Sequence, residues 1–232
     1  MVTTLYLVRH GATEGSGVKR YYGSIDVPLS EKGVRQVRDA STLIRRYLRI
    51  LGYSQRSSYL REIHRASRVG SGPGVEDERL QAVYCSDLSR AVRSAEIVAE
   101  PYALNGVVIP ELRERSFGIW EGMTFTEIKE TYPSEFESWA GNPLQYSPPG
   151  GESTLEVKGR VCGVLDMILQ NHPGENIAVV AHGGVNRIIL CHLLGIPLEN
   201  IFRIEQEYGA VNIIEFWERY PVVKLVNGRG YE

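Results

Sequence analysis

The chain has 232 residues, of which 43% are hydrophobic and 23% charged, and its formal net charge is -2. This composition is typical of a folded globular protein with a sizeable core. The near balance of charge excludes a generally basic surface of the kind that nucleic acid or an anionic membrane binds. We therefore expect no nucleic-acid and no membrane partner, and any anion must be bound by a local group of basic residues.

Cysteine usage and the N-terminal sequence indicate a cytoplasmic protein. The three cysteines, Cys85, Cys162 and Cys191, form no CxxC pair and are odd in number, which favours reduced thiols over a disulfide framework or a zinc site. The N-terminus has no basic leader, and no segment approaches the ~18 continuous apolar residues of a membrane-spanning helix. We expect a soluble, cytoplasmic protein whose cysteines pack as small apolar side chains.

The first predicted element is a buried strand that ends in polar residues. An apolar run over 5–8 leads directly into Arg9, His10 and Gly11. Ligands of α/β proteins bind beyond the carboxyl ends of the strands, so this end of the strand is a candidate active site. An exposed Arg–His pair in a turn is the alternative interpretation of these residues taken alone.

A polar loop over 14–27 follows and lies beside the candidate site. Ser30 is a suitable N-cap, and apolar residues then recur at helical spacing from Val34 to Leu51. The next segment, at about 52–78, is locally basic and ends in a Gly-Ser-Gly-Pro-Gly run, which indicates a loop. We expect a solvated insertion or a short surface helix there; a flap that grips substrate is the alternative.

Arg90 lies just beyond a second short strand, predicted over 82–85. The next helix starts close by, so Arg90 falls in its first turn, where free backbone N–H groups and the positive helix end already favour an anion. An arginine at this place indicates an anionic ligand. An ion pair between Arg90 and Asp87 or another nearby carboxylate is the alternative.

A third short strand, predicted over 107–109, ends at Pro110 and precedes a lid-like region at about 112–150. This region starts as a glycine-punctuated loop with several carboxylates and continues as short helical pieces broken by Pro133. Its aromatic residues are candidates for core packing or for contact with an organic substrate, and packing accounts for most of them. They are Phe125, Tyr132, Phe136, Trp139 and Tyr146.

The clearest strand of the chain is a continuous apolar run over 177–181. Before it, Ser153 and Glu156 have the form of a capping box that opens a helix. The run itself is typical of a strand buried on both faces in a parallel sheet. It ends in His182 and two glycines, and a further helix is predicted over 185–194.

Strands alternate with helices for most of the length, and two final strands, over 211–217 and 222–226, form a predicted hairpin. This order predicts an α/β fold, a three-layer α/β/α sandwich with a mostly parallel central sheet and an antiparallel C-terminal edge. No repeat or linker divides the chain. We expect a single domain over 1–232.

Two of the predicted strands end in the same way, at His10 and at His182, and each histidine is followed by glycine. In one parallel sheet these ends share an edge, so the two imidazoles can meet in one crevice with Arg90 on the same side. Two arginines and two histidines suit a phosphoryl group. No HxH or HExxH spacing is present, and we expect no metal and no cofactor. The remaining histidines are assigned to the surface or to packing: His64, His172 and His192.

Four motifs in this order resemble those of the histidine phosphatase superfamily, also called phosphoglycerate-mutase-like. They are Arg9-His10-Gly11, the run 86–91, Leu112-Arg113-Glu114-Arg115 with Gly118, and His182-Gly183. The resemblance implies the fold of that superfamily, with His10 as the phosphorylated nucleophile and Glu114 as the proton donor. It also implies that Arg9, Arg90 and His182 hold the phosphoryl oxygens.

The chain departs from the family pattern in the loop after His10. Many members carry an asparagine six residues beyond this histidine, where the chain has Ser16. A serine hydroxyl can still donate a hydrogen bond to phosphate, and we expect Ser16 and Gly183 to contact it. The expected substrate-binding residues lie in the same loop: Arg20, Tyr22 and Gly23.

The chemistry of these residues agrees with the implied roles. A nucleophilic imidazole must be unprotonated, and the nearby charges of Arg9 and Arg90 lower the pKa of His10. Glu114 can give a proton to the leaving alkoxide and then activate water to hydrolyse the phosphohistidine. The site therefore suits an enzyme, a phosphoric monoester hydrolase.

We expect a metal-independent phosphomonoesterase that acts on a small organic phosphate. The runs 118–122, 148–153 and 223–227 are similar to those of alpha-ribazole-5'-phosphate phosphatases of cobalamin assembly and their broad-specificity relatives. A phosphoglycerate mutase is one alternative, although mutases carry a longer, basic stretch where this chain has Lys129 as the one basic residue of 123–149. A catalytically idle phospho-ligand binding module is another. Both a monomer and a homodimer are compatible with the sequence.

Overall fold

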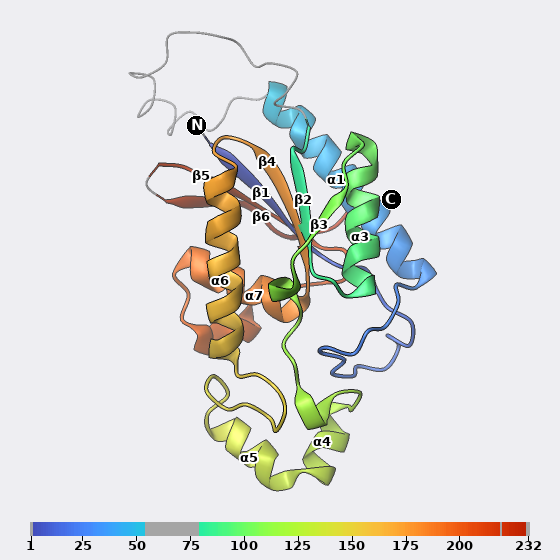
Figure 1. Cartoon of the computed structure of the whole chain (residues 1–232), viewed down its shortest axis with the longest axis vertical. Helices are drawn as coiled ribbons and strands as arrows, with labels where there is room; N and C mark the ends of the chain where they lie inside the picture. The colour runs from blue at the N-terminus through green and yellow to red at the C-terminus, as the bar shows by residue number, and fades with distance from the viewer. Residues whose placement is uncertain (1, 54–78, 219, 231–232) are drawn as a thin grey trace.

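A mixed β-sheet lies at the centre of the protein, and helices cover both of its faces (Figure 1). The computed structural model describes residues 2–53, 79–218 and 220–230. Within these residues the sheet has six strands in the order β3-β2-β4-β1-β5-β6. The strands are β1 Thr3–Arg9, β2 Ala82–Cys85, β3 Gly106–Val108, β4 Asn176–Ala181, β5 Val211–Phe216 and β6 Pro221–Gly228.

The first four strands in chain order are parallel, and the last two form an antiparallel hairpin at one edge. β4 pairs in parallel with both β1 and β2, and β2 pairs in parallel with β3. β5 runs antiparallel to β1, and β6 antiparallel to β5. The predicted mostly parallel sheet with an antiparallel C-terminal edge is therefore confirmed.

The pairing register of β1 and β4 makes these two central strands end at the same level. Leu7 lies opposite Val179 and Arg9 opposite Ala181. All six residues of β4 are buried, as expected for a strand covered on both faces. The residues that follow these two strands, His10 and His182, are consequently neighbours at the carboxyl edge of the sheet.

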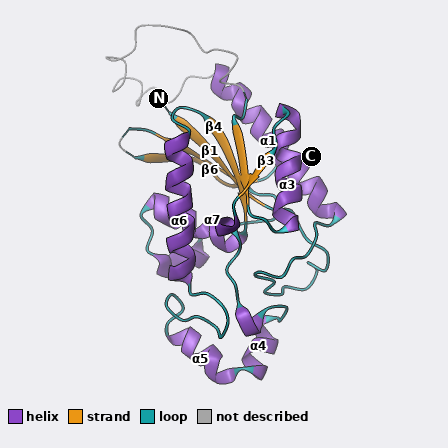
Figure 2. Ribbon diagram, in the orientation of Figure 1, coloured by secondary structure: helices purple, strands orange, loops and turns teal. Residues whose placement is uncertain are grey.

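Alternate residues of β1 enter two separate cores, which makes the molecule three layers thick (Figure 2). Leu5 and Leu7 pack with the helices α6 and α7, whereas Tyr6 and Val8 pack with α1 and α3. The α-helices are α1 Glu31–Tyr53, α3 Ser89–Ala99, α4 Phe125–Thr131, α5 Pro133–Gly141, α6 Thr154–Asn171 and α7 Gly183–Leu194. Short 3-10 helices are η3 Glu100–Tyr102, η4 Pro110–Leu112, η5 Gly118–Trp120 and η6 Leu198–Arg203.

The helix ends follow the local signals of the sequence. The Ser30 hydroxyl accepts a hydrogen bond from the Gly33 N–H at 3.1 Å and so caps α1. Ser153 and Glu156 form both hydrogen bonds of a capping box at the start of α6. Gly195, with φ of 65°, ends α7 in the left-handed conformation that favours glycine.

The lid-like region is built from α4 and α5, which lie beyond the sheet at the end of the molecule opposite the N-terminus (Figure 1). Pro133 is the first residue of α5, so the predicted break falls where the structure has one. The aromatic rings of this region pack on one another: Trp120 stacks on Tyr146 and meets Trp139 edge to face. Phe125 is exposed, and the other four aromatic residues named for this region are only partly buried, so contact with substrate stays a prediction beside packing. Movement of the region as a lid stays a prediction.

The structure bears on the predictions for the cysteines and for membrane spans, but not on those for the insertion and the domain count. Cys85 and Cys191 are buried free thiols and Cys162 is partly buried, as expected for cysteines that pack as apolar side chains. No helix in the described part of the chain is long and apolar enough to cross a membrane. The basic insertion at 52–78 lies outside the described residues except for its first two positions. A single domain over 1–232 stays a prediction.

Gly33 allows α1 to pack directly against the loop after β1. A Cβ atom at Gly33 would collide with the main-chain carbonyl oxygen of Ala12. We expect Gly33→Ala to lower the free energy of unfolding by about 1–3 kcal/mol, because the strain of overpacking exceeds the helix propensity that alanine adds. Urea denaturation measures the change.

Gly163→Ala is the matched control, since Gly163 lies within α6 with no heavy atom near the added Cβ. This variant should gain about 0.5–1 kcal/mol from helix propensity alone. Equal effects of the two substitutions would contradict the close approach of α1 to the loop.

Candidate active site

The main chain of His10 is fixed between β4 and the loop that precedes β5. Its N–H donates to the carbonyl oxygen of Ala181 at 3.0 Å, and its own carbonyl accepts from the Gly209 N–H at 3.1 Å. The residue is 6% exposed. His10 therefore has a rigid setting with a small opening to solvent.

The His10 ring is held through one of its two nitrogen atoms. Nδ1 lies 2.7 Å from the carbonyl oxygen of Gly11; since a carbonyl can only accept, Nδ1 carries the hydrogen and Nε2 keeps its lone pair. Burial, reinforced by the charges of Arg9 and Arg90, holds the pKa of His10 well below its usual range. The neutral imidazole is the form that attacks phosphorus.

His182 follows β4 and faces His10 across the crevice. The two ring centroids are 5.1 Å apart with an interplanar angle of 62°. Burial, together with the charges of His10, Arg90 and Arg9, holds the pKa of His182 well below its usual range. Its Nδ1 atom is buried and has no hydrogen-bond partner among the described residues, so this atom is available to a ligand.

Ser86 sets the orientation of His182, and it was not among the predicted site residues. The Ser86 hydroxyl lies 2.7 Å from Nε2 of His182, and both residues are fully buried. When this hydroxyl donates to Nε2, Nδ1 carries the hydrogen and can donate to a phosphoryl oxygen. One signal was present: Ser86 directly follows β2, which ends at the same edge of the sheet as His182.

Main-chain and aromatic contacts hold the guanidinium group of Arg9 in place. Its Nη1 donates to the carbonyl oxygen of Gln206 at 2.5 Å, and its guanidinium lies 3.8 Å from the ring centroid of Tyr208. Nε of Arg9 is buried without a partner among the described residues. Gln206 and Tyr208 were not predicted, because nothing in sequence indicates a partner nearly two hundred residues from Arg9.

Arg90 is 3% exposed, and it bonds to carbonyl oxygens of the loop after β1. Nη1 donates to Ile25 and Nη2 to Gly23, each at 2.8 Å. The alternative of an Arg90–Asp87 pair is wrong, because Asp87 accepts both hydrogen bonds of Arg113 at 2.5 and 2.6 Å. Arg90 therefore has no carboxylate among these hydrogen-bond partners, and its positive charge stays available to an anion.

Glu114 reaches the same crevice at the start of α7. Oε2 accepts from the Gly184 N–H at 2.9 Å, and Oε1 accepts from the Arg115 N–H at 3.0 Å. Both glycines after His182 make room for the site: a Cβ at Gly184 would lie 2.5 Å from Oε1 of Glu114, and one at Gly183 would lie 3.2 Å from Nε of Arg9. The helix N-terminus thus holds a carboxyl group beside the cations.

The other predicted residues lie in the loop after His10 and make contacts of their own. Arg20 donates to both oxygens of Glu127, at 2.8 and 3.3 Å, and to the carbonyl of Gly122. The N–H of Ser16 closes a turn on the carbonyl of Thr13.

Gly23 and Tyr22 complete this loop. Gly23 has φ of 50°, and its carbonyl oxygen accepts a hydrogen bond from Arg90. Tyr22 lies close to Gly15, since its hydroxyl would be 3.2 Å from a Cβ atom added there. Contacts of these residues and of Ser16 with substrate or phosphate stay predictions.

The crevice combines buried cations, two neutral imidazoles and one carboxyl group. Among the described residues, no group of three or more His, Cys, Asp and Glu side chains could hold a metal ion. His172, assigned to packing, bonds to Glu175 and to the hydroxyl of Tyr84 away from the crevice. Such a site fits a phosphoryl group and is typical of phosphate-binding enzymes.

Comparison with known sequences gives the family. The sequence profile of the histidine phosphatase superfamily (branch 1) matches residues 5–75 and 60–229. The chain belongs to this superfamily, and the prediction of a histidine phosphatase family enzyme is confirmed. The phosphoserine phosphatase 1 of Hydrogenobacter thermophilus is 28% identical over 96% of the chain and 91% of its own length.

Further relatives agree with this assignment. The adenosylcobalamin/alpha-ribazole phosphatase of Salmonella typhimurium is 25% identical over 97% of the chain and 96% of its own length. The bifunctional protein Rv2228c of Mycobacterium tuberculosis is 33% identical over 99% of the chain, which spans 55% of that protein.

Solved structures show the same fold. A putative alpha-ribazole-5'-P phosphatase from Escherichia coli superposes with a TM-score of 0.78 at 23% identity and covers 99% of this chain and 98% of its own. Bacillus stearothermophilus YhfR superposes with a TM-score of 0.75 at 28% identity, with 96% of each chain covered. The predicted phosphoglycerate-mutase-like fold is confirmed.

The lowered pKa values of His10 and His182 predict that acid destabilises the protein. Unfolded histidines titrate near pH ~6.5, so below that pH the unfolded chain binds up to two more protons than the folded chain. The free energy of unfolding should therefore fall as pH decreases, by up to about 2.7 kcal/mol per pH unit. Urea unfolding between about pH 7 and pH 5 measures this slope.

His10→Gln is the control for the pH dependence. This variant removes one of the two imidazoles, so its slope should be about half that of the natural chain in the same window. An unfolding free energy that does not change with pH in the natural chain would contradict the buried neutral state of both rings.

Proposed function

We propose that the protein hydrolyses small organic phosphomonoesters through a phosphohistidine formed on Nε2 of His10. The observation that carries the proposal is the pair of buried, unpartnered donors, Nε of Arg9 and Nδ1 of His182, next to a neutral His10 ring whose Nδ1 is occupied. Unpaired donors are costly in a folded protein. A bound phosphoryl group would complete their hydrogen bonds.

In the first step, Nε2 of His10 attacks phosphorus and the bond between phosphorus and the ester oxygen breaks. The leaving oxygen takes a proton from the carboxyl group of Glu114 and departs as an alcohol. Arg9, Arg90 and His182 stabilise the charge that develops on the three other phosphoryl oxygens. The alcohol, the phosphohistidine and the Glu114 carboxylate are the products of this step.

In the second step, water attacks the phosphohistidine. The Glu114 carboxylate takes a proton from the water as its oxygen bonds to phosphorus, and the bond between phosphorus and Nε2 breaks. Inorganic phosphate leaves, and His10 and Glu114 return to their starting states. The fixed charges of arginine side chains suit both steps, and no redox change or cofactor is needed for the balance.

The substrate in this proposal is a small organic phosphate. Alpha-ribazole 5'-phosphate is the first candidate, supported by the full-length relative named as an adenosylcobalamin/alpha-ribazole phosphatase. O-phosphoserine is the second, supported by the relative named phosphoserine phosphatase 1. A role in cobalamin biosynthesis follows from the first candidate alone. A cytoplasmic location and a homodimer stay predictions.

The mechanism predicts that His10 is indispensable. His10→Ala should lower kcat for p-nitrophenyl phosphate by at least about 10³-fold, because no nucleophile remains to accept the phosphoryl group. The natural protein, stopped in mid-turnover with ³²P-labelled substrate, should carry an acid-labile, base-stable phosphate that His10→Ala lacks. The hydrolysis should persist in excess chelator.

His172→Ala is the matched control, since His172 lies outside the crevice. It should retain the activity and the labelled phosphoenzyme. Full activity of His10→Ala, or loss of all activity in chelator, would overturn the proposal.

A panel of phosphomonoesters tests the substrate. We expect the highest kcat/KM for alpha-ribazole 5'-phosphate or O-phosphoserine among sugar, nucleotide and glycolytic monophosphates, each assayed by release of inorganic phosphate. The same preparation should not interconvert 2- and 3-phosphoglycerate in the presence of the bisphosphate. Rapid interconversion would replace the phosphatase proposal with the mutase alternative.

A further inference from the structure

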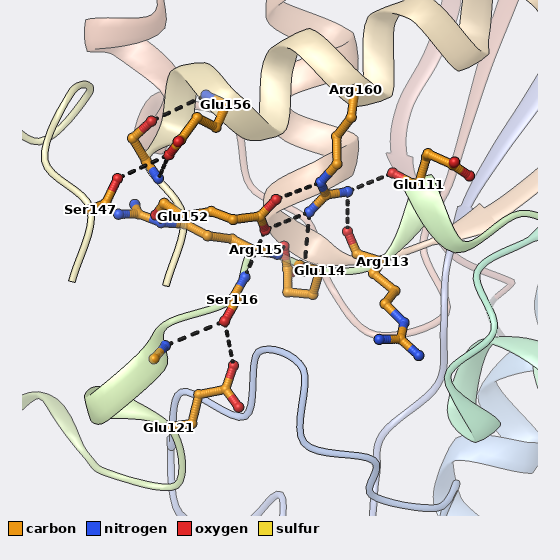
Figure 3. Close-up of polar contacts among 12 residues, drawn as sticks. Glu111, Arg113, Glu114, Arg115, Ser116, Glu121, Ser147, Glu152, Glu156 and Arg160 are labelled. Atoms are coloured by element: carbon orange, nitrogen blue, oxygen red, sulfur yellow. Dashed lines mark hydrogen bonds and ion pairs between the residues drawn. The ribbon is translucent and has the colours of Figure 1, made fainter. Parts of the chain in front are cut away.

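The guanidinium of Arg160, on α6, has a hydrogen-bond partner for each of its five N–H groups (Figure 3). Nε and Nη2 donate to the two carboxylate oxygens of Glu152 at 2.7 and 2.8 Å. The three other N–H groups point at main-chain carbonyl oxygens, those of Glu111, of Arg113 at 2.8 Å and of Glu114 at 3.3 Å. Arginine is the side chain whose planar fork can serve so many acceptors at once.

The three carbonyl groups belong to the segment that carries Glu114 into the crevice. This segment runs from η4, which contains Glu111, to the start of η5 at Gly118. Arg113 and Glu114 lie between these two short helices, where regular helix or strand bonding does not engage their carbonyl groups, so side-chain donors can satisfy them. Arg160 supplies these donors on the side of the chain that leads to Glu114.

Glu152 holds the same segment on the other side of Glu114. Its Oε2 accepts from the Ser116 N–H at 2.9 Å, and its own N–H donates to the Ser116 carbonyl at 2.9 Å. Burial alone would raise the pKa of Glu152, but the hydrogen bonds from Arg160 and Ser116 outweigh it and lower this pKa. The charged pair of Arg160 and Glu152 thus brackets residues 113–116.

We propose that Arg160 is a positioning residue for Glu114 and sets the reach of its carboxyl group toward the leaving oxygen. The inference rests on the proposed function, in which Glu114 is the proton donor. Misplacement of a reacting group by about 1 Å can cost about 10²-fold in rate. A purely structural arginine would instead change stability and leave the balance between substrates untouched.

The dependence of rate on the leaving group separates these two roles. p-Nitrophenolate departs without a proton, whereas the alkoxide from glycerol 2-phosphate needs one from Glu114. We expect Arg160→Gln to lower kcat/KM for glycerol 2-phosphate by about 10- to 100-fold and kcat/KM for p-nitrophenyl phosphate by less than about 3-fold. The comparison uses kcat/KM because this quantity reports the steps up to release of the alcohol and excludes the second step, in which Glu114 acts as a base on both substrates.

A double-mutant cycle with Glu114→Gln completes the test. Glu114→Gln should also lose more activity on the alkyl ester than on the aryl ester. When Arg160→Gln is combined with Glu114→Gln, the rate on either substrate should fall by less than about a further 3-fold. Equal losses on both substrates in Arg160→Gln, or full additivity with Glu114→Gln, would overturn the role of Arg160. If Glu114→Gln itself affects both esters equally, the acid role of Glu114 in the proposed function fails, a separate outcome.

Control variants keep the experiment decisive. Arg79→Gln removes an arginine that also donates to main-chain carbonyls, those of Leu80 and Tyr102, far from the crevice, and both rates should stay unchanged. Arg160→Lys keeps the charge but offers three donors instead of five, so a loss of about 3- to 10-fold on the alkyl ester is expected. Natural activity in Arg160→Lys would overturn the proposal. Should Arg160→Gln not fold, Arg160→Lys and Glu152→Gln carry the same comparison.

Discussion

Positive charge is buried at the carboxyl edge of the sheet, and within the described part of the chain no carboxylate hydrogen-bonds to it. Arg9 and Arg90 both take main-chain carbonyl oxygens as partners, which orient the guanidinium groups without neutralising them. A desolvated cation of this kind is unfavourable unless an anion approaches it. The crevice therefore suits an anionic ligand, and burial, reinforced by the same cations, keeps both imidazoles neutral.

Acidic side chains near the crevice are kept apart from these arginines by partners of their own. Asp87 is held by Arg113 and Glu152 by Arg160, and Glu114 takes two main-chain N–H groups. This separation matters, because a carboxylate bonded to Arg9 or Arg90 would compete with phosphate for the same donors. The donors of Arg9 and Arg90 that face the crevice thus stay available to a phosphate.

The strands β1 and β4 and the histidines that follow them could be predicted from sequence because they depend on local patterns. An apolar run that ends in histidine places that histidine at the carboxyl edge of a parallel sheet, so the meeting of His10 and His182 needed no knowledge of packing. Capping signals at Ser30 and Ser153 located the starts of α1 and α6 for the same reason. The family motifs then selected Glu114.

Long-range side-chain contacts could not be predicted, since nothing local specifies them. Asp87 could have paired with Arg90 or with Arg113, and only the path of the loop after η4 decides in favour of Arg113. Gln206 meets Arg9 from the far end of the chain. The aromatic residues of the lid-like region could be read either as a substrate surface or as a small core, because the two interpretations share one composition.

Arg20 joins two parts of the molecule that are about a hundred positions apart in sequence. Its bonds to Glu127 and Gly122, with the ladder contact between Arg20 and Thr124, tie the loop after β1 to the start of α4. Exchange of either segment alone would break these contacts. Exchange of the loop after β1 between family members would therefore require the start of α4 to be exchanged with it.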